Sequence, residues 1–515
     1  MSETNPPSND DRPPDASLDI SSAELQQLSS SVTKLVTEYF ATVSDLPVFP
    51  DTSGGKTIAA LGTSLPTDGA PLDQLLADCE TIIQNSRHNG HPRFFGYVAS
   101  PANAPAAFAD LLASTLNSNV TSWRSGPAAT EIERTVINWL ATLIGYATDE
   151  LPAHGLLTSG GSMANLTALL IAHRAKSAEA STCGLWNTSP MTIYASDQIH
   201  MSIPKAADIL GLGRAQVRLI PTDDQFRINV SLLRQKIAED LNQGLKPFCV
   251  VASAGTVNTG AVDPLAEVAS IAKEFKLWFH IDGAYGALAA LDATKRDLFA
   301  GLSAADSISL DPHKWLYVPI DSGCLLFRDP ERAHAAFSFD GADYIKVHEQ
   351  NSDEAFAFWN YGPELSRRFR ALKIWLTLRY YGTQRIARTI SEDITMAAYL
   401  AERINAAPDF ELLAAPVLSI CCFRYVPAHL RAQIEATKSA QGRADLDPQL
   451  NRLNERIMHR VQRGGRAYLS NAMLRGQFAL RACIINFRTT RADIDLTLET
   501  VREAAHEIEA EDESN

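Results

Sequence analysis

Apolar residues recur every three or four positions from Ser21 to Tyr39, which is the spacing of an amphipathic helix. Ser22 is the predicted N-cap of this helix. A second helix is expected from about Pro71 to Asn85, after a linker rich in glycine, proline and threonine. The apolar face of the first helix consists of Leu25, Leu28, Val32, Leu35 and Val36.

From about Gly90 the pattern changes to short, continuous apolar runs that alternate with helical segments. Such runs are typical of strands buried on both faces, so we expect an α/β fold whose mostly parallel sheet has helices on both sides. A helix over FRALKIWLTLRYYG is predicted to close this domain. The predicted strands are MTIYAS, PFCVVASAG, LWFHID, ADSISLD and SGCLLFR.

Beyond about Thr389 the sequence predicts a smaller α+β unit with strands in PVLSICCFRYV and FALRACIINFR. The polar stretch PAHLRAQIEATKSAQGRADLD between them is interpreted as a mobile loop. The first residues are acidic and rich in proline, serine and aspartate, without the basic start and apolar stretch of a secretion signal. The predicted organisation is a disordered tail (1–20), an N-terminal helical segment (21–100), a large α/β domain (101–388) and a small C-terminal domain (389–515).

Charge and cysteine content narrow the function classes. The formal net charge of −14 over 515 residues argues against general binding of nucleic acid or anionic membrane. No apolar run approaches the roughly 18 residues of a membrane-spanning helix. The seven cysteines are scattered without a ligand-like spacing, which favours reduced thiols, a cytoplasmic location and no metal site.

Candidate chemistry lies in four separated segments. In GLLTSGGSMANL, a short apolar stretch runs into Gly160, Gly161 and Ser162 and then into a helix. Glycines allow close approach to backbone N–H groups, and a helix start attracts anions. An ordinary strand-to-helix turn without a ligand is the alternative. In YASDQIHMS, His200 follows a strand and could lie over a flat ring, although an isolated histidine is often only structural.

Two charged residues follow the next predicted strands. Asp282 in LWFHIDGAYGA precedes small residues that leave room for a flat ligand, and could pair with a protonated pyridine nitrogen. A helix cap or a salt bridge is the alternative. Lys314 in SISLDPHKWLYVP has apolar and aromatic neighbours, and a desolvated lysine can form a Schiff base with an aldehyde. A surface charge is the alternative here. In α/β folds such strand ends form ligand sites.

These segments resemble the group II pyridoxal-phosphate decarboxylases, and specifically the aromatic-L-amino-acid decarboxylase family. The resemblance runs from HPRFFGYV through LSRRFRALKIW and more weakly to LRACIINFRTT. It includes GPAATEIERTVINWL, TSGGSMANLTAL, SDQIHMS, HIDGAYGA and DPHKW. The resemblance implies the aspartate-aminotransferase-like fold (fold type I) and a homodimer with active sites at the subunit interface. The N-terminal helices would pack against the partner subunit.

The same resemblance implies roles for single residues with pyridoxal 5′-phosphate. Lys314 matches the Schiff-base lysine, Asp282 the pyridinium partner and His200 the ring-stacking histidine. Gly161 and Ser162 match the phosphate-binding turn.

Three further positions match cofactor contacts in the family. His313 is similar to a residue beside the phosphate, and Thr256 to part of the loop under the cofactor. Asp311 stands where the aromatic enzymes often carry asparagine. Val257 replaces a threonine that is common in the family, so one hydrogen bond is expected to be missing.

Tyr344, in FDGADYIKVHEQ, matches a tyrosine that protonates the α-carbon in the family, although a solvent-exposed loop tyrosine is the alternative. Tyrosine there favours an amine product, whereas phenylalanine would suggest an aldehyde synthase. Tyr97, Ser100 and Trp123 match the walls of the substrate pocket. Ser366 matches a position where plant enzymes that prefer phenols carry serine.

The sequence therefore predicts decarboxylation of an aromatic L-amino acid similar to tyrosine or Dopa. Decarboxylation of glutamate, cysteine sulfinate or 2,4-diaminobutyrate stays open, as does aldehyde synthesis. An acidic side chain would need an extra arginine, and a diamino acid an extra carboxylate. A cofactor-binding protein without catalysis is the alternative of a different class.

Overall fold

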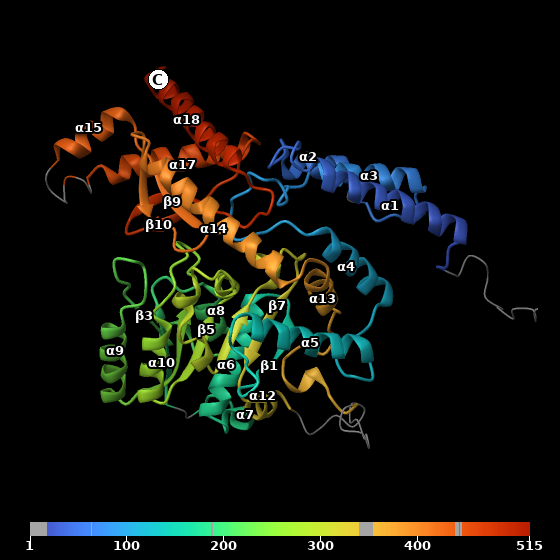
Figure 1. The fold of residues 1–515 in the computed structure, drawn as a ribbon, viewed down its shortest axis with the longest axis vertical. Coiled ribbons are helices and arrows are strands. Elements are labelled where there is room, and N and C mark those ends of the chain that lie inside the picture. Colours follow the sequence, from blue (N-terminus) through green and yellow to red (C-terminus); the bar gives the residue numbers. More distant parts are fainter. Residues whose placement is uncertain are drawn as a thin grey trace, which may run out of the picture.

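The computed structural model describes residues 18–62, 64–186, 189–338, 354–437, 442 and 445–514. Figure 1 shows a large α/β unit, a smaller unit above it that contains the C-terminal helix, and a set of N-terminal helices that projects to one side. Among the described residues, no helix is both long and apolar enough to cross a membrane.

The large unit is built on a seven-stranded sheet with the order β1-β7-β6-β5-β4-β2-β3. Neighbouring strands from β3 to β6 are parallel, and only β7 runs antiparallel to its neighbours. The expected fold class is therefore confirmed, and all five strands predicted for this domain form. The strands are β1 (His154–Thr158), β2 (Met191–Ser196), β3 (Val217–Ile220), β4 (Lys246–Ser253), β5 (Trp278–Asp282), β6 (Ser307–Leu310) and β7 (Gly323–Phe327).

Helix α6 (Gly161–Lys176) packs across β4 to β7, and α9 and α10 contact β4. Every residue of β2 and β5 is buried, as their continuous apolar sequences require. The other helices of this unit are α4 (Ala104–Leu116), α5 (Pro127–Leu143), α7 (Ala180–Cys183), α8 (Ser202–Ile209), α9 (Val230–Asn242), α10 (Leu265–Glu274), α11 (Pro312–Trp315), α12 (Pro330–Phe337) and α13 (Ala371–Tyr381).

The smaller unit has an antiparallel sheet with the order β10-β11-β9-β8. The predicted boundary between 388 and 389 falls within α14, which continues from the large unit into the small one, and it stays a prediction. The elements are α14 (Thr383–Asn405), β8 (Phe410–Ala414), β9 (Ile420–Tyr425), α15 (Ala428–Ala436), α17 (Asp447–Arg463), β10 (Ser470–Leu474), β11 (Gln477–Cys483) and α18 (Arg491–Ser514).

The prediction of a loop after β9 is wrong for its first part, where α15 forms. Leu430 and Ile434 lie four residues apart and are buried with Val426 and Leu450 in a small apolar cluster. Two buried apolar residues on one face are enough to stabilise this helix, although the surrounding residues are polar.

The N-terminal helices are α1 (Ser22–Thr42), α2 (Gly54–Leu61) and α3 (Leu72–Gln84). Ser21, rather than Ser22, caps α1, because its side chain and that of Glu24 form a reciprocal capping box. Helix α2 lies in the segment expected to be a linker, so that expectation is wrong. None of the three helices has a buried residue. On the apolar face of α1, Leu25, Leu28 and Val32 are exposed, and Leu35 and Val36 are half-buried.

Candidate active site

The polar residues singled out in the sequence lie at one edge of the large sheet. Strands β2, β4, β5 and β6 are neighbours and parallel, so their carboxyl ends meet at this edge. His200, Thr256, Asp282 and Lys314 stand at or shortly after these four ends. All four line one cavity of about 550 Å³. The topology thus brings together residues that the sequence separates by more than a hundred positions.

Asp282, the last residue of β5, is almost fully buried and accepts three hydrogen bonds. Asn165 Nδ2 donates to Oδ2 at 3.0 Å, and the Ser309 hydroxyl and the Ala284 N–H donate to Oδ1 at 3.2 Å each. These three donors fix the orientation of the carboxylate at the edge of the cavity. Asp282 can therefore present its carboxylate to a cationic ring.

Lys314 lies on the short helix α11, which Pro312 begins directly after β6. Its ammonium group is 2.8 Å from Asp311 Oδ2, and its side chain is 16% exposed. The neighbouring Trp315 and Leu316 are fully buried. The apolar neighbours in the sequence therefore anchor the helix in the core, while Lys314 itself lines the polar cavity.

His313 points its Nδ1 at the Ser322 carbonyl, 2.7 Å away, so Nδ1 carries the proton and donates. Its Nε2 lies 3.7 Å from Asp311 Oδ2, and burial lowers the pKa of His313. A neutral imidazole nitrogen is thus directed at the same carboxylate that binds Lys314.

The start of α6 forms a tight cradle at the cavity. A Cβ on Gly161 would lie 2.8 Å from the Ala284 Cβ and 3.0 Å from Asp311 Oδ2, so only glycine fits without a shift. Ser162 follows it, and both line the cavity with Gly160. The N-terminus of this helix has the positive end of its dipole and free N–H groups, which suit a phosphate.

Pyridoxal phosphate fits the chemistry of this set of residues. The cavity offers an amine for the aldehyde, a carboxylate for the ring nitrogen, a helix start for the phosphate and a small alanine beside the ring position. Asp311 Oδ1 is buried without a hydrogen-bond partner in the described structure, which shows that the site is not satisfied by protein groups alone.

His200 and Thr256 also line the cavity. His200 Nδ1 accepts the Ser202 N–H at 3.2 Å and lies 2.9 Å from the Ser202 hydroxyl. The Thr256 hydroxyl lies 3.0 Å from that of Thr259 and accepts the Ala261 N–H at 3.2 Å. Thr256 therefore stabilises the loop 256–261 through these hydrogen bonds.

Of the four residues predicted for the substrate pocket, only Tyr97 lines the cavity of its own chain. Its hydroxyl lies 3.2 Å from that of Tyr468. Ser100 donates to the His313 carbonyl at 2.8 Å and lines a neighbouring cavity. Trp123 and Ser366 are not part of the lining, and Ser366 is exposed. Tyr344 lies outside the described residues.

Arg481 is a site residue that the sequence patterns did not single out. It lines the cavity from β11 and is 3% exposed. Its Nη1 donates to the Tyr97 carbonyl at 2.7 Å and its Nε to the Asn258 carbonyl at 3.3 Å, whereas Nη2 has no partner in the described structure. The sequence signal that could have identified it is the arginine inside the apolar run FALRACII. A charged residue is rarely buried in a strand unless it has a partner or a function.

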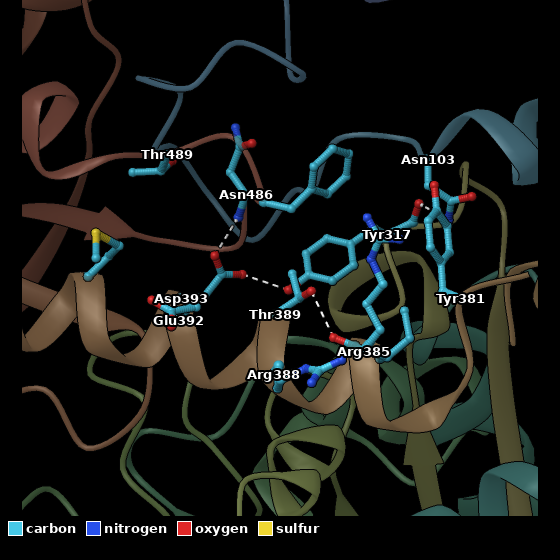
Figure 2. A pocket seen from close by; sticks show the side chains of 13 residues that line it. Asn103, Tyr317, Tyr381, Arg385, Arg388, Thr389, Glu392, Asp393, Asn486 and Thr489 are labelled. Carbon is cyan, nitrogen blue, oxygen red and sulfur yellow. Dashed lines mark hydrogen bonds between the residues drawn. The ribbon is translucent and has the colours of Figure 1, made fainter.

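A second cavity, of about 430 Å³, lies along α14 and reaches Tyr317, three residues after Lys314. Figure 2 shows Tyr317 and Asp393 pointing toward each other in it, with Asn486 beside Asp393. The Tyr317 hydroxyl donates to Asp393 at 2.8 Å, and the Asn486 N–H at 3.3 Å. No cation contacts Asp393 among the described residues, and burial raises its pKa from 3.8 to about 8.

We expect Asp393→Asn to flatten the pH dependence of stability. Between about pH 4 and 8 the folded chain keeps a proton on Asp393 that the unfolded chain has released. Raising the pH therefore removes stability from the wild type, on the order of 5–6 kcal/mol across this window. The variant should melt near the wild type at pH 5 and several degrees above it at pH 9, measured by thermal unfolding. Glu392→Gln, an exposed neighbour, is the control, and equal slopes in wild type and Asp393→Asn would contradict the expectation.

Comparison with known proteins identifies the family of the chain. Residues 55–426 match the family model described as the pyridoxal-dependent decarboxylase conserved domain. The chain is 35% identical to an aromatic-L-amino-acid decarboxylase of Bacillus atrophaeus, covering 95% of this chain and 97% of the relative. It is 30% identical to a 4-hydroxyphenylacetaldehyde synthase of Rhodiola rosea, with 98% of both chains covered.

Among solved structures, Oryza sativa TDC with PLP and tryptamine superposes with a TM-score of 0.87 at 27% identity, over 95% of this chain and 99% of that one. The family model covers well over half of the chain, and the first relative matches almost its whole length. The chain therefore belongs to the pyridoxal-phosphate-dependent amino-acid decarboxylases.

Proposed function

We propose that this enzyme decarboxylates an aromatic L-amino acid with a phenolic side chain, such as tyrosine or Dopa, to the amine and carbon dioxide. The observation that carries the choice of substrate is the distribution of charge in the cavity. Of the residues described there, Arg481 is the sole arginine, Asp282 has three donors, and Asp311 binds Lys314 through Oδ2 and keeps only Oδ1 open.

The substrate must present its own α-carboxylate, and Arg481 is the group available to attract it. Its Nη2 lacks a partner, and an unmade hydrogen bond of a buried donor is costly, so an approaching carboxylate gains free energy there. An acidic side chain would then find no second arginine in this lining. A diamino acid would need a free carboxylate; Asp282 has three donors, and Asp311 binds Lys314 through Oδ2 and lies against Gly161, where the phosphate would bind.

The lining around Arg481 is otherwise uncharged and polar. Tyr97, Asn258, Ser470 and Asn471 line this part of the cavity with hydroxyl and amide groups. Such groups suit a phenol, which is flat and apolar with one hydroxyl to bind.

Bound pyridoxal phosphate supplies an aldehyde that condenses with amines and a ring that takes up the electron pair left when the carboxylate departs. Lys314 would hold the aldehyde carbon, Gly161 and Ser162 the phosphate, and Asp282 the proton on the ring nitrogen. His200 would lie over the ring, beside His313, Asp311 and Thr256 as further contacts. Tyr344 would deliver the proton to the α-carbon, which favours amine over aldehyde.

A homodimer is part of the proposal. Leu25 and Val32 of α1 are 57% and 39% exposed, so a long apolar face lacks a cover within its own chain. Trp123 and Ser366 do not line the cavity of their own chain, which fits a role at the cavity of the partner. Light scattering that gives the mass of one chain at assay concentration would contradict this part.

The test is carbon dioxide release from each natural amino acid and from Dopa, with added pyridoxal phosphate. Tyrosine or Dopa should exceed tryptophan by about ten-fold or more in kcat/KM, because a pocket that binds a hydroxyl discriminates by at least this much. Clear preference for tryptophan, histidine or an acidic amino acid would refute the proposed substrate. Release of peroxide and ammonia would identify an aldehyde synthase instead.

Ser366→Gly separates the substrate question from the reaction itself. The variant should gain tryptophan turnover relative to tyrosine, since it loses a hydroxyl and opens space. Ser391→Ala, on α14 and hydrogen-bonded to its own helix, is the matched control and should keep the wild-type ratio.

A further inference from the structure

A buried hydrogen-bond network connects Asp282 with His200 on the protein side of the cavity. Its centre is Asn165 of α6, which is fully buried. The Asn165 side chain contacts three groups: Asp282 Oδ2 at 3.0 Å, the Ser202 hydroxyl at 2.9 Å and His280 Nε2 at 3.0 Å. One amide thus joins β5 to the segment that carries His200.

The chemistry of both ends fixes the direction of these bonds. An ionised Asp282 can only accept, so the atom of Asn165 that faces it must be Nδ2. Asn165 Oδ1 then faces His280, and His280 Nε2 must carry a proton in order to donate. A flipped amide would place its oxygen against the carboxylate, which electrostatic repulsion disfavours.

The hydrogen bonds at the Trp278 end of the network also require His280 to carry its proton on Nε2. Trp278 can only donate, and its Nε1 donates to the Ser307 hydroxyl at 2.9 Å. That hydroxyl lies 2.9 Å from His280 Nδ1 and donates its own proton there. Burial lowers the pKa of His280, so the ring is neutral, with Nδ1 as acceptor and Nε2 as donor.

A branch of the network sets the orientation of His200. The Ser202 hydroxyl accepts from Asn165, so its proton is free to donate to His200 Nδ1, 2.9 Å away. The Ser202 N–H also donates to this nitrogen, at 3.2 Å. A neutral His200 therefore carries its proton on Nε2.

We propose that Asn165 and His280 are positioning residues that form a directional hydrogen-bond relay from Trp278 to Asp282, with a branch to His200. The relay holds the carboxylate of Asp282 in place, and it fixes which nitrogen of a neutral His200 carries the proton. The expected effect of the relay on cofactor binding rests on the proposed function. The tautomers of His200 and His280, in contrast, can be measured in the protein without cofactor.

The proton pattern is tested first on the wild type. The full chain is labelled with ¹⁵N-histidine and its imidazole tautomers are read by NMR before and after addition of pyridoxal phosphate. His200→Gln and His280→Gln serve to assign the two signals. We expect both rings to carry their proton on Nε2. A proton on Nδ1 of His280 would overturn the relay, whether or not the enzyme releases carbon dioxide.

The role of the central amide is tested by two variants. Asn165→Leu has a similar volume but cannot donate, so Asp282 loses one of three donors and holds the ring proton less well. We expect pyridoxal phosphate to bind about ten-fold or more weakly, and the signal of a ¹⁵N-labelled cofactor ring to shift toward the unprotonated form. Thr167→Val is the matched control, because this threonine is buried on the same helix but donates only to the Met163 carbonyl.

Asn165→Asp gives a readout that a purely structural role would not produce. Two carboxyl groups in contact cannot both ionise, so positions 165 and 282 should share one proton. At low pH the protonated pair replaces the lost donor, and affinity for pyridoxal phosphate should approach that of the wild type. It should fall as the pH rises.

The other titratable groups around this pair are His280 and His200, with Lys314 and Asp311 in the same cavity; all four are common to both proteins. His200, Lys314 and Asp311 do not contact position 165, so they cancel when the affinity of the variant is divided by that of the wild type at each pH. His280 does contact it, so the same ratio is also measured with His280→Gln in both proteins. If Asn165→Leu fails to fold, the pH dependence of Asn165→Asp decides alone. Unchanged affinity and ring signal in Asn165→Leu, or a flat ratio for Asn165→Asp, would overturn the proposal.

Discussion

Lys314→Ala is expected to lose carbon dioxide release by roughly a thousand-fold or more, since an amine nucleophile has no substitute at its position. The amine of Lys314 lies 2.8 Å from Asp311 and lines the cavity beside the start of α6. Borohydride treatment of the wild type loaded with pyridoxal phosphate should label this lysine, and the variant should stay unlabelled. Absorbance of the bound cofactor and mass spectrometry of the labelled peptide are the measurements.

A second buried lysine provides an internal control. Lys373 is 1% exposed and binds Asp110 at 3.1 Å and the Pro319 carbonyl at 3.0 Å, outside the lining of the cavity. It should remain unlabelled, which shows that burial alone does not create the reactive amine. Lys176→Ala, at an exposed site, should keep full activity. Label on Lys373, or retained turnover in Lys314→Ala, would refute the assignment.

The sequence predicted the parts of this site that follow strand ends. Continuous apolar runs identify β2, β4, β5 and β6, and parallel strands carry whatever follows them to the same edge of the sheet. His200, Asp282 and Lys314 could therefore be grouped by their positions along the chain alone. Their roles with the cofactor came from the resemblance to a family rather than from spacing.

Other features depend on contacts that no local pattern encodes. Asn165 looks like an ordinary polar residue within a helix, yet three residues 37, 115 and 117 positions away meet it. The ion pair between Lys314 and Asp311 contradicts the apolar environment that their neighbours in sequence suggested. Trp123 and Ser366 show a further limit, because neither lines the cavity of its own chain, and a pocket shared in the proposed dimer would not be visible in one chain.

Removing Arg367 is the change expected to cost most stability. Arg367 is 2% exposed and forms an ion pair with Glu133, which is fully buried on α5. It also donates to the Val120 and Leu157 carbonyls, at 2.8 and 2.9 Å, and lies 4.2 Å from the ring centre of Phe358. Arg367→Met leaves the Glu133 charge in the core without its partner.

We expect Arg367→Met to lower the free energy of unfolding by about 3–5 kcal/mol, the usual cost of breaking a buried pair. Arg368→Met, at the exposed neighbouring position, should cost less than about 1 kcal/mol. Adding Glu133→Leu to Arg367→Met should recover part of the loss, because no charge is then buried. Thermal unfolding of the four proteins measures this, and equal losses for the two arginines would contradict it.

The same arginine connects the stability of the fold with the choice of substrate. Arg367 follows Ser366 directly, and its carbonyl accepts the Val120 N–H at 2.9 Å, three residues before Trp123. The two segments proposed to reach the cavity of the partner are thus hydrogen-bonded to each other. Arg367 also donates to the Leu157 carbonyl, which links both segments to β1, beside the start of α6. Arg367→Met should therefore also reduce the discrimination between tyrosine and tryptophan at temperatures where the chain is still folded, whereas Arg368→Met should leave it unchanged.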